Sequence, residues 1–219
     1  MVYKDRLDAG RRLAEQLIQY RQHPQAIVLA LPRGGVPVGF GVCQLLGLPL
    51  DIFVVRKIGV PGHEETAMGA IASGGVRVLN KDIIRTLGIR DEVIAAAAAV
   101  EQVELERRES LYRGDRFLPD LTNRIVILVD DGMATGASMA AAVQALTAFR
   151  LRRLVVAVPV ADQEVLNQFK DSVDELICPH RPPVFQAVSL WYEDFSQTTD
   201  EQVRAYLRKA EEIPVNRVD

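Results

Sequence analysis

Five aliphatic residues followed directly by two aspartates constrain the fold of this chain more than any other feature. Residues 125–129 are IVILV, and Asp130 and Asp131 come next. A short, continuous apolar run is typical of a strand that is buried on both faces, as the strands of parallel sheets are. Further runs occur at residues 26–30, 51–55, 154–158 and 173–177, with a short sixth at 187–191. The pattern therefore predicts a mainly parallel sheet.

Helix-forming segments separate these runs. We predict helices at residues 5–22, 36–46, 80–87, 92–112, 138–149 and 163–169, and a charged amphipathic stretch at 200–212. Residues 69–72 and 76–79 flank Ser-Gly-Gly, which predicts a β-hairpin. Alternating strands and helices indicate an α/β fold, with an open, mainly parallel sheet and helices on both faces. No repeat or linker divides the chain, so we expect a single domain over residues 1–219.

Charge and composition exclude several classes of protein. The 219 residues carry a formal net charge of −3, so no overall basic character predicts nucleic-acid binding. The two cysteines, Cys43 and Cys178, form no zinc or disulfide pattern, which fits a reducing compartment. The chain does not begin with a signal peptide, and no apolar run approaches the ~20 residues of a membrane span. We therefore expect a cytoplasmic protein without a membrane or nucleic-acid partner.

The acid pair and the loop after it have the chemistry of a sugar-phosphate site. In an α/β sheet, Asp130 and Asp131 would lie at the carboxyl edge, where ligands bind. Neighbouring carboxylates are unfavourable there unless ribose hydroxyls or the water shell of a magnesium ion satisfy them. Gly132 and Gly136 allow a tight turn, and the hydroxyl of Thr135 and the start of a helix add donors for a phosphate. We expect a phosphorylated ribose to bind here.

Two other phosphate-binding loops do not match this segment. A Walker loop needs Gly-Lys-Ser/Thr, whereas Gly136 is followed by Ala137. A dinucleotide fingerprint needs GxGxxG at the start of the first helix, and the spacing from Gly132 to Gly136 differs. The remaining alternative is an acidic turn that caps a helix without binding anything.

Residues 125–138 resemble the phosphoribosyl pyrophosphate motif of type I phosphoribosyltransferases, in which apolar residues, two acids, Thr-Gly and a small or hydroxyl pair follow one another. The order of elements resembles this family over residues 26–191, and the whole sequence resembles its bacterial branch of predicted phosphoribosyltransferases. The resemblance implies that Asp130 and Asp131 contact the ribose hydroxyls. It assigns the 5′-phosphate to Ala134, Thr135, Gly136, Ala137 and Ser138. It also implies a small hood, a flexible loop, a homodimer and Mg²⁺, which Asp131 would hold indirectly through water.

The other half of the predicted site binds pyrophosphate. Arg33, Gly34 and Gly35 follow the first strand, at the position where the family binds pyrophosphate with backbone amides. Arg33 offers a fork of donors and the glycines permit close approach, although the same residues could form a plain strand-to-helix turn. Arg56 and Lys57 follow the second strand and could neutralise a departing pyrophosphate.

Residues 56–66 are polar and rich in glycine and proline, which predicts a loop, and the resemblance makes it the mobile lid of the site. His63, Glu64 and Glu65 lie in this loop and are expected to be solvated; the alternative is that His63 or Glu64 contributes a donor or a proton to the closed site. They do not form the HExxH pattern of a zinc site.

The predicted base pocket rests on Trp191 and Tyr192, which could supply a stacking ring or could simply belong to the core. The resemblance also contains a departure. Enzymes for 6-oxopurines carry an acid immediately before the Thr-Gly, where this chain has Ala134. This difference argues against a 6-oxopurine acceptor and leaves adenine-like, pyrimidine or unusual acceptors open.

We therefore predict a Mg²⁺-dependent phosphoribosyltransferase that transfers ribose 5-phosphate from phosphoribosyl pyrophosphate to a nitrogenous base and releases pyrophosphate. Its catalytic residues would be Asp130, Asp131, Arg56 and Lys57. One alternative is a regulatory protein that binds phosphoribosyl pyrophosphate or a nucleotide without transferase activity. Another is hydrolysis or phosphorolysis of a phosphorylated ribose.

Overall fold

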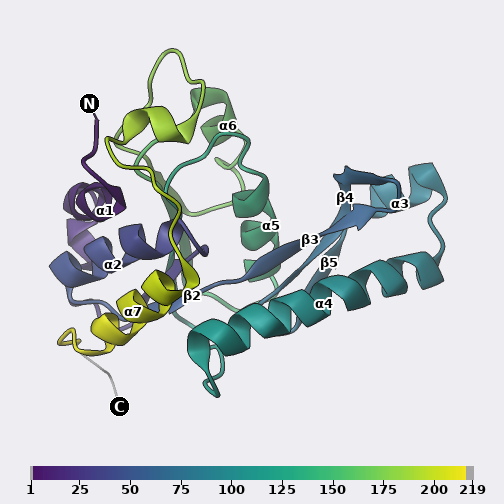
Figure 1. Ribbon diagram of the computed structural model, residues 1–219, viewed down its shortest axis with the longest axis horizontal. Coiled ribbons are helices and arrows are strands. Elements are labelled where there is room, and N and C mark those ends of the chain that lie inside the picture. Colours follow the sequence, from purple (N-terminus) through teal and green to yellow (C-terminus); the bar gives the residue numbers. More distant parts are fainter. Residues whose placement is uncertain (1, 216–219) are drawn as a thin grey trace.

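Five short strands form the main sheet, and all neighbouring strands in it run parallel (Figure 1). The computed structural model describes residues 2–215. Within them the order across the sheet is β2-β1-β6-β7-β8. The strands are β1 (Ala26–Ala30), β2 (Leu50–Ile52), β6 (Ile125–Val129), β7 (Arg153–Ala157) and β8 (Glu175–Ile177). The predicted α/β fold with a mainly parallel sheet is confirmed.

Alternate residues of the central strands point to opposite faces of the sheet, and both faces are covered. Val126 and Leu128 of β6 belong to one hydrophobic cluster, whereas Ile127 and Val129 belong to another. Because both sets are apolar, β6 is a continuous hydrophobic run rather than an alternating one. All five residues of β6 are buried.

Helices on the two faces complete these clusters. Helices α1 (Arg6–Glu15) and α2 (Gly35–Leu46) cover one face, and α5 (Ala137–Leu146) and α6 (Gln163–Asn167) cover the other (Figure 1). The α1 helix begins where the Asp5 side chain accepts a hydrogen bond from the Asp8 backbone. No helix among residues 2–215 is both long and apolar enough to cross a membrane.

A second, antiparallel sheet projects from the main body together with two helices (Figure 1). We call this part the arm; it consists of β3 (Val55–Val60), β4 (His63–Ala72), β5 (Val76–Leu79), α3 (Lys81–Leu87) and α4 (Asp91–Arg113). The pairing of Ala72 with Val76 confirms the predicted hairpin. Helix α7 (Asp200–Glu211) packs near the base of the arm, against α2 and α4.

The prediction of a loop at residues 56–66 was wrong, because β3 and β4 form an antiparallel hairpin there. The predicted strand at 51–55 is likewise divided between β2 of the main sheet and β3 of the arm. Ile58 and Val60 alternate with polar residues and pack with Met68 in the cluster that includes α4. This period-two pattern outweighs the local glycine and proline content that suggested a loop.

The sixth strand predicted at residues 187–191 was also wrong. This segment contains a short 3₁₀-helix, η2 (Val188–Trp191), which lies outside both sheets. The Val188 side chain lies so close to Gly132 that an added Cβ on that glycine would come within 2.6 Å of it. Apolar residues of this segment are therefore packed over the loop that follows β6 rather than along a sheet edge. The predicted helix at 5–22 is shorter as well, ending at Glu15 before a 3₁₀ turn at Ile18–Tyr20.

Ser73, directly after β4, is hydrogen-bonded to Val54 in the link between β2 of the main sheet and β3 of the arm. Its side chain is fully buried, and its Oγ accepts a hydrogen bond of 2.9 Å from the Val54 backbone N–H. The Ser73 N–H donates in return to the Val54 carbonyl at 2.9 Å. The hydroxyl therefore satisfies a buried backbone donor that belongs to neither sheet.

We expect Ser73→Ala to lower the free energy of unfolding by about 1–3 kcal/mol, because it leaves the buried Val54 N–H without an acceptor. Denaturant unfolding followed by circular dichroism measures this loss. Ser172→Ala changes an exposed serine and serves as the control, with an expected change near zero. Equal stability of the two variants would contradict the assigned role of the hydroxyl.

Candidate functional site

The site lies where β1 and β6 end side by side. These strands are neighbours, with Ala30 of β1 paired to Val129 of β6. The chain after β1 enters α2 on one face of the sheet, and the chain after β6 enters α5 on the other face (Figure 1). Connections that diverge in this way open a crevice at the carboxyl edge of the sheet. The fold therefore brings residues 31–35 and 130–136 to one place.

The two predicted halves of the site touch each other at two glycines. An ideal Cβ on Gly34 would lie 2.1 Å from Oδ2 of Asp131, and one on Gly35 would lie 2.7 Å from the Val129 carbonyl oxygen. The Leu31 N–H also donates to the Val129 carbonyl at 2.9 Å. Only glycine permits this approach of the loop after β1 to the acid pair.

Asp130 and Asp131 differ in their surroundings although they are adjacent. Oδ1 of Asp130 accepts a hydrogen bond of 2.8 Å from the Asp131 N–H. Burial, followed by the neighbouring Asp131 charge, holds the pKa of Asp130 well above its usual range. Burial also raises the pKa of Asp131, while the hydrogen bond and charge of Arg6 oppose that rise. Two neighbouring carboxyls with raised pKa values are typical of a functional site.

Arg6 is a site residue that the sequence did not reveal. Its Nε donates to Oδ2 of Asp131 at 2.8 Å, and the two side chains are only 11% and 16% exposed. Its Nη1 donates to the Ser196 carbonyl at 2.7 Å, and its guanidinium lies 3.9 Å from the centroid of the Phe195 ring. A lone arginine at the start of an amphipathic helix carries no signal of such a role, because it looks like any solvated residue.

The loop after the acid pair leads into α5 and is fixed at its middle. The Met133 N–H donates to the Val160 carbonyl at 3.0 Å, which fixes the middle of the loop to the segment after β7. Gly136 has a φ of +68° and caps α5, which begins at Ala137. Ala134, Thr135, Ala137 and Ser138 are exposed beside it. The Ala137 N–H lies 3.4 Å from Oγ1 of Thr135, which accepts its hydrogen bond.

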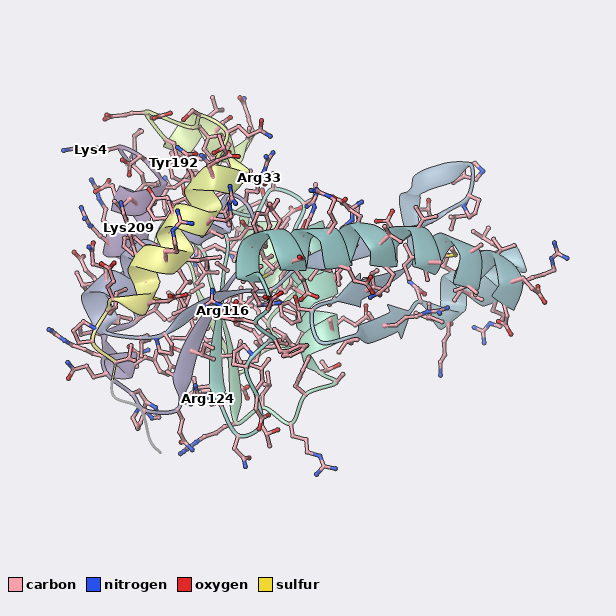
Figure 2. The ribbon with its side chains drawn as sticks, turned by 60° about the horizontal axis from the view of Figure 1, so that its bottom comes forward. Lys4, Arg33, Arg116, Arg124, Tyr192 and Lys209 are labelled. Carbon is pink, nitrogen blue, oxygen red and sulfur yellow. The ribbon has the colours of Figure 1, made fainter. Side chains whose placement is uncertain are left out.

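Arg33 is held by the helices at the base of the arm. Its guanidinium lies 3.8 Å from Oδ1 of Asp200, the first residue of α7. The same oxygen accepts a hydrogen bond of 2.6 Å from the Tyr112 hydroxyl of α4. In Figure 2, Arg33 lies at the end of α7 opposite Lys209, and Arg124 marks the far end of the sheet. The Arg33 side chain therefore belongs to the same edge of the sheet as the acid pair.

The two other predicted cations lie in the arm. Arg56 forms an ion pair of 2.7 Å with Glu101 of α4, and Lys57 is exposed on β3. No ion pair joins either residue to the acid pair within the described part of the chain. His63 is exposed at the start of β4. The side chains of Glu64 and Glu65 lie outside the described residues.

Trp191 and Tyr192, the aromatic residues predicted for a base pocket, make different contacts. The Tyr192 hydroxyl donates to the Asp131 carbonyl at 2.5 Å, and its ring packs between Tyr3 and Phe195. Trp191 contacts the His180 ring, with 4.5 Å between the ring centroids. That either ring stacks on a base stays a prediction.

Comparisons with known proteins agree with this geometry. The family model of the phosphoribosyl transferase domain matches residues 2–179. The chain therefore belongs to the phosphoribosyl transferase family. It is 43% identical over 209 residues to a Mycobacterium tuberculosis protein that is provisionally named a phosphoribosyl transferase. That alignment covers 95% of this chain and 47% of the relative, so the chain spans about half the length of the curated relatives it matches.

A solved structure is similar over nearly the whole chain. The crystal structure of TT1426 from Thermus thermophilus is 41% identical and superposes with a TM-score of 0.85. The match covers 95% of this chain and 99% of that one. The architecture described above, with its arm, is therefore shared with an experimentally solved protein.

We expect Gly34→Ala to destabilise the fold by about 1–3 kcal/mol, because its backbone is helical but its Cβ would collide with the Asp131 carboxylate. Asp131→Ala removes the colliding group, so the double variant should recover part of that loss in a double-mutant cycle. Denaturant unfolding of all four proteins provides the measurement. Additive effects of the two substitutions would contradict the close approach.

Proposed function

We propose that this protein transfers ribose 5-phosphate from phosphoribosyl pyrophosphate to a nitrogenous base and releases pyrophosphate. The observation that carries the proposal is the contact between the glycine loop after β1 and the acid pair after β6. The loop after β1 suits an anion such as pyrophosphate. The loop after β6 combines two carboxylates with the N-terminus of α5, which suits a phosphate. A ligand that carries a diol, a monophosphate and a pyrophosphate would use both loops at once.

The groups of the ligand can be matched to named residues. Asp130 and Asp131 would accept hydrogen bonds from the ribose hydroxyls, and residues 134–138 would bind the 5′-phosphate through backbone N–H groups at the start of α5. Arg33, Gly34 and Gly35 would bind the pyrophosphate. Arg56 and Lys57 would join them only if the arm's residues reach the ligand, which for Arg56 requires leaving Glu101.

The reaction exchanges one bond at the sugar C1 for another. The base nitrogen forms a bond to C1 with its lone pair, the bond from C1 to the pyrophosphate oxygen breaks, and pyrophosphate leaves with that electron pair. The nitrogen then releases its proton to solvent. Positive charge develops on the sugar in the transition state, and the carboxylates beside it would stabilise that charge. Donors around Arg33 would stabilise the departing anion.

The acid pair fits a magnesium ion that arrives with the ligand. Among residues 2–215, no group of three or more His, Cys, Asp or Glu side chains could hold a metal by itself. Magnesium in such sites is bound by one or two carboxylates together with water and substrate phosphates. When bound, it would neutralise charge on the pyrophosphate, and Asp131 would contact it through water.

The homodimer implied by the family resemblance is part of the same proposal.

Pyrophosphate release tests the proposed reaction. The protein is incubated with phosphoribosyl pyrophosphate, magnesium and a panel of adenine, pyrimidines, 6-oxopurines and other nitrogen acceptors. We expect turnover with a base outside the 6-oxopurines, since Ala134 replaces their acid. The Asp130→Asn/Asp131→Asn variant should lose donor binding in calorimetry, while Asp82→Asn, on the exposed surface of α3, should not. Tight donor binding without turnover would favour the regulatory alternative, and unchanged affinity in the double variant would refute the site.

Donor binding should depend on pH because the site uses carboxylates. Burial raises the pKa of both Asp130 and Asp131, so each carboxyl becomes protonated at a higher pH than an exposed aspartate, whose pKa is about 3.9. Protonation removes an acceptor for the ribose hydroxyls. We therefore expect donor affinity to fall as the pH is lowered, with a midpoint above 3.9 in calorimetric titrations. A midpoint at or below that value would show that the buried carboxyls do not control binding.

A further inference from the structure

A cavity of about 390 Å³ lies at the edge of the main sheet opposite the acid pair. Its walls come from the amino ends of β1 and β2, the residue before β6, the link after α4 and the end of α7. This volume lies within the range of known small-molecule pockets. The cavity is separate from the proposed substrate site, since the two lie at opposite ends of α7. Asp200 beside Arg33 begins this helix and Glu211 of the cavity ends it, 12 residues or about 18 Å away.

The cavity has apolar walls and an uncovered aromatic ring. Ile27, Leu50 and Ile213 contribute aliphatic side chains to its lining. Phe117 also lines it, and its side chain is 91% exposed, more than any other large apolar residue in the described part of the chain. An aromatic ring at the mouth of an apolar cavity offers a flat surface on which a planar group can pack. The walls therefore suit the apolar part of a ligand.

The charged residues that line the cavity are paired, with one exception. Asp51 accepts an ion pair of 2.9 Å from the buried Arg113, and Arg116 pairs with Glu211 across the mouth. Arg124 forms no ion pair with any residue from 2 to 215. In Figure 2, Arg124 lies at the far end of the molecule from Arg33, with Arg116 between them. The uncompensated charge of the cavity is therefore positive.

The guanidinium of Arg124 also has an unused edge. Its Nη1 donates to the Pro24 carbonyl at 3.3 Å, whereas its Nε is buried and has no hydrogen-bond partner among the described residues. A buried donor without an acceptor is unfavourable and is rare in folded proteins. The Nε and Nη2 groups of an arginine form one edge that binds two oxygens of an anion. An anionic group placed there would satisfy the buried donor.

We propose that this cavity is a second ligand site, which binds a small molecule that combines a planar aromatic group with an anionic group. The anion would bind the Nε edge of Arg124, and the aromatic group would lie between Phe117 and the aliphatic wall. The inference goes beyond the proposed transfer reaction and does not depend on it. None of its residues belongs to the loops after β1 and β6.

Two fluorescent probes that differ in one group test this site. Anilinonaphthalene sulfonate is a planar aromatic anion whose emission rises in an apolar environment, and phenylnaphthylamine has the same rings without the sulfonate. Each is titrated into the folded 219-residue chain, and circular dichroism confirms that every variant keeps its fold. We expect saturable binding of the sulfonate at one site, and weaker binding of the uncharged probe.

Two substitutions, each with a control, locate the bound probe. Arg124→Met should weaken binding of the sulfonate by about tenfold or more, because a charge-assisted hydrogen bond is lost, and should leave the uncharged probe unaffected. Phe117→Ala should weaken both probes. The control Arg150→Met changes an exposed arginine outside the cavity, and Val100→Ala changes a side chain of α4 that is 70% exposed. Neither control should alter binding.

Equal affinity for the two probes, or unchanged sulfonate affinity in Arg124→Met, would overturn the proposal and leave only an apolar surface. Absence of saturable binding would overturn it as well. A loss of affinity in Arg33→Met but not in Arg124→Met would also overturn it, because the anion would then bind the loop after β1. Should Arg124→Met not fold, Arg124→Lys replaces it, since lysine keeps the charge without the two-donor edge. Weaker sulfonate binding in that variant supports the site, and wild-type affinity overturns it.

Discussion

The pairing of β1 with β6 is the interaction on which the rest of the site depends. Ala30 and Val129 are register partners, so the two strands end at the same level and send their loops in different directions. The glycines after β1 then meet the carboxylates after β6 at a distance that no side chain would tolerate. Buried strands on both sides and a helix layer on each face make this register rigid, because a slip of one residue would exchange the two apolar clusters.

Two segments far apart in the sequence, at Tyr3 and at Tyr192, meet at this edge. Tyr3 pairs with the segment at Tyr192 through backbone hydrogen bonds of 2.8 Å to Trp191 and Glu193. That pairing places α1, and therefore Arg6, beside Asp131. The sheet alone would supply a strand end with two acids. Residues 3–6 supply Arg6, the counter-ion of Asp131. Residues 192–196 supply Tyr192, which binds the Asp131 carbonyl, and Phe195, which packs on Arg6.

The arm is connected to the part of the site that contains Arg33. Tyr112 of α4 donates to Asp200 of α7, and Asp200 in turn lies next to Arg33. Arg56 of β3 is paired with Glu101 of the same α4 helix. The carboxylates of Asp200 and Glu101 thus lie beside the two arginines that we propose for pyrophosphate. Two polar contacts, from Tyr112 to Asp200 and from Asp200 to Arg33, thus connect α4 to Arg33.

The amino-acid sequence by itself determined the elements whose signal is local. The apolar run at 125–129 predicted a buried strand, and the structure has it. That the acid pair and the turn after it bind a phosphorylated ribose stays a prediction. Gly34 and Gly35, which the sequence assigned to the same site, lie beside the acids in the structure. The hairpin at residues 55–72 was missed because its alternating pattern is short and interrupted by glycine and proline, and its stability comes from packing on α4.

Tertiary structure alone decided which distant residues complete the site. Arg6 and Asp200 look like ordinary helix residues in sequence, and they gain their roles only from packing of α1 and α7 against the sheet. The hydrogen bond from the Tyr192 hydroxyl to the Asp131 carbonyl likewise could not be predicted from the sequence. Periodicity encodes which face of an element is apolar, but it carries no information about which partner that face will meet. The acid pair was therefore readable from the sequence, whereas its counter-ion was not.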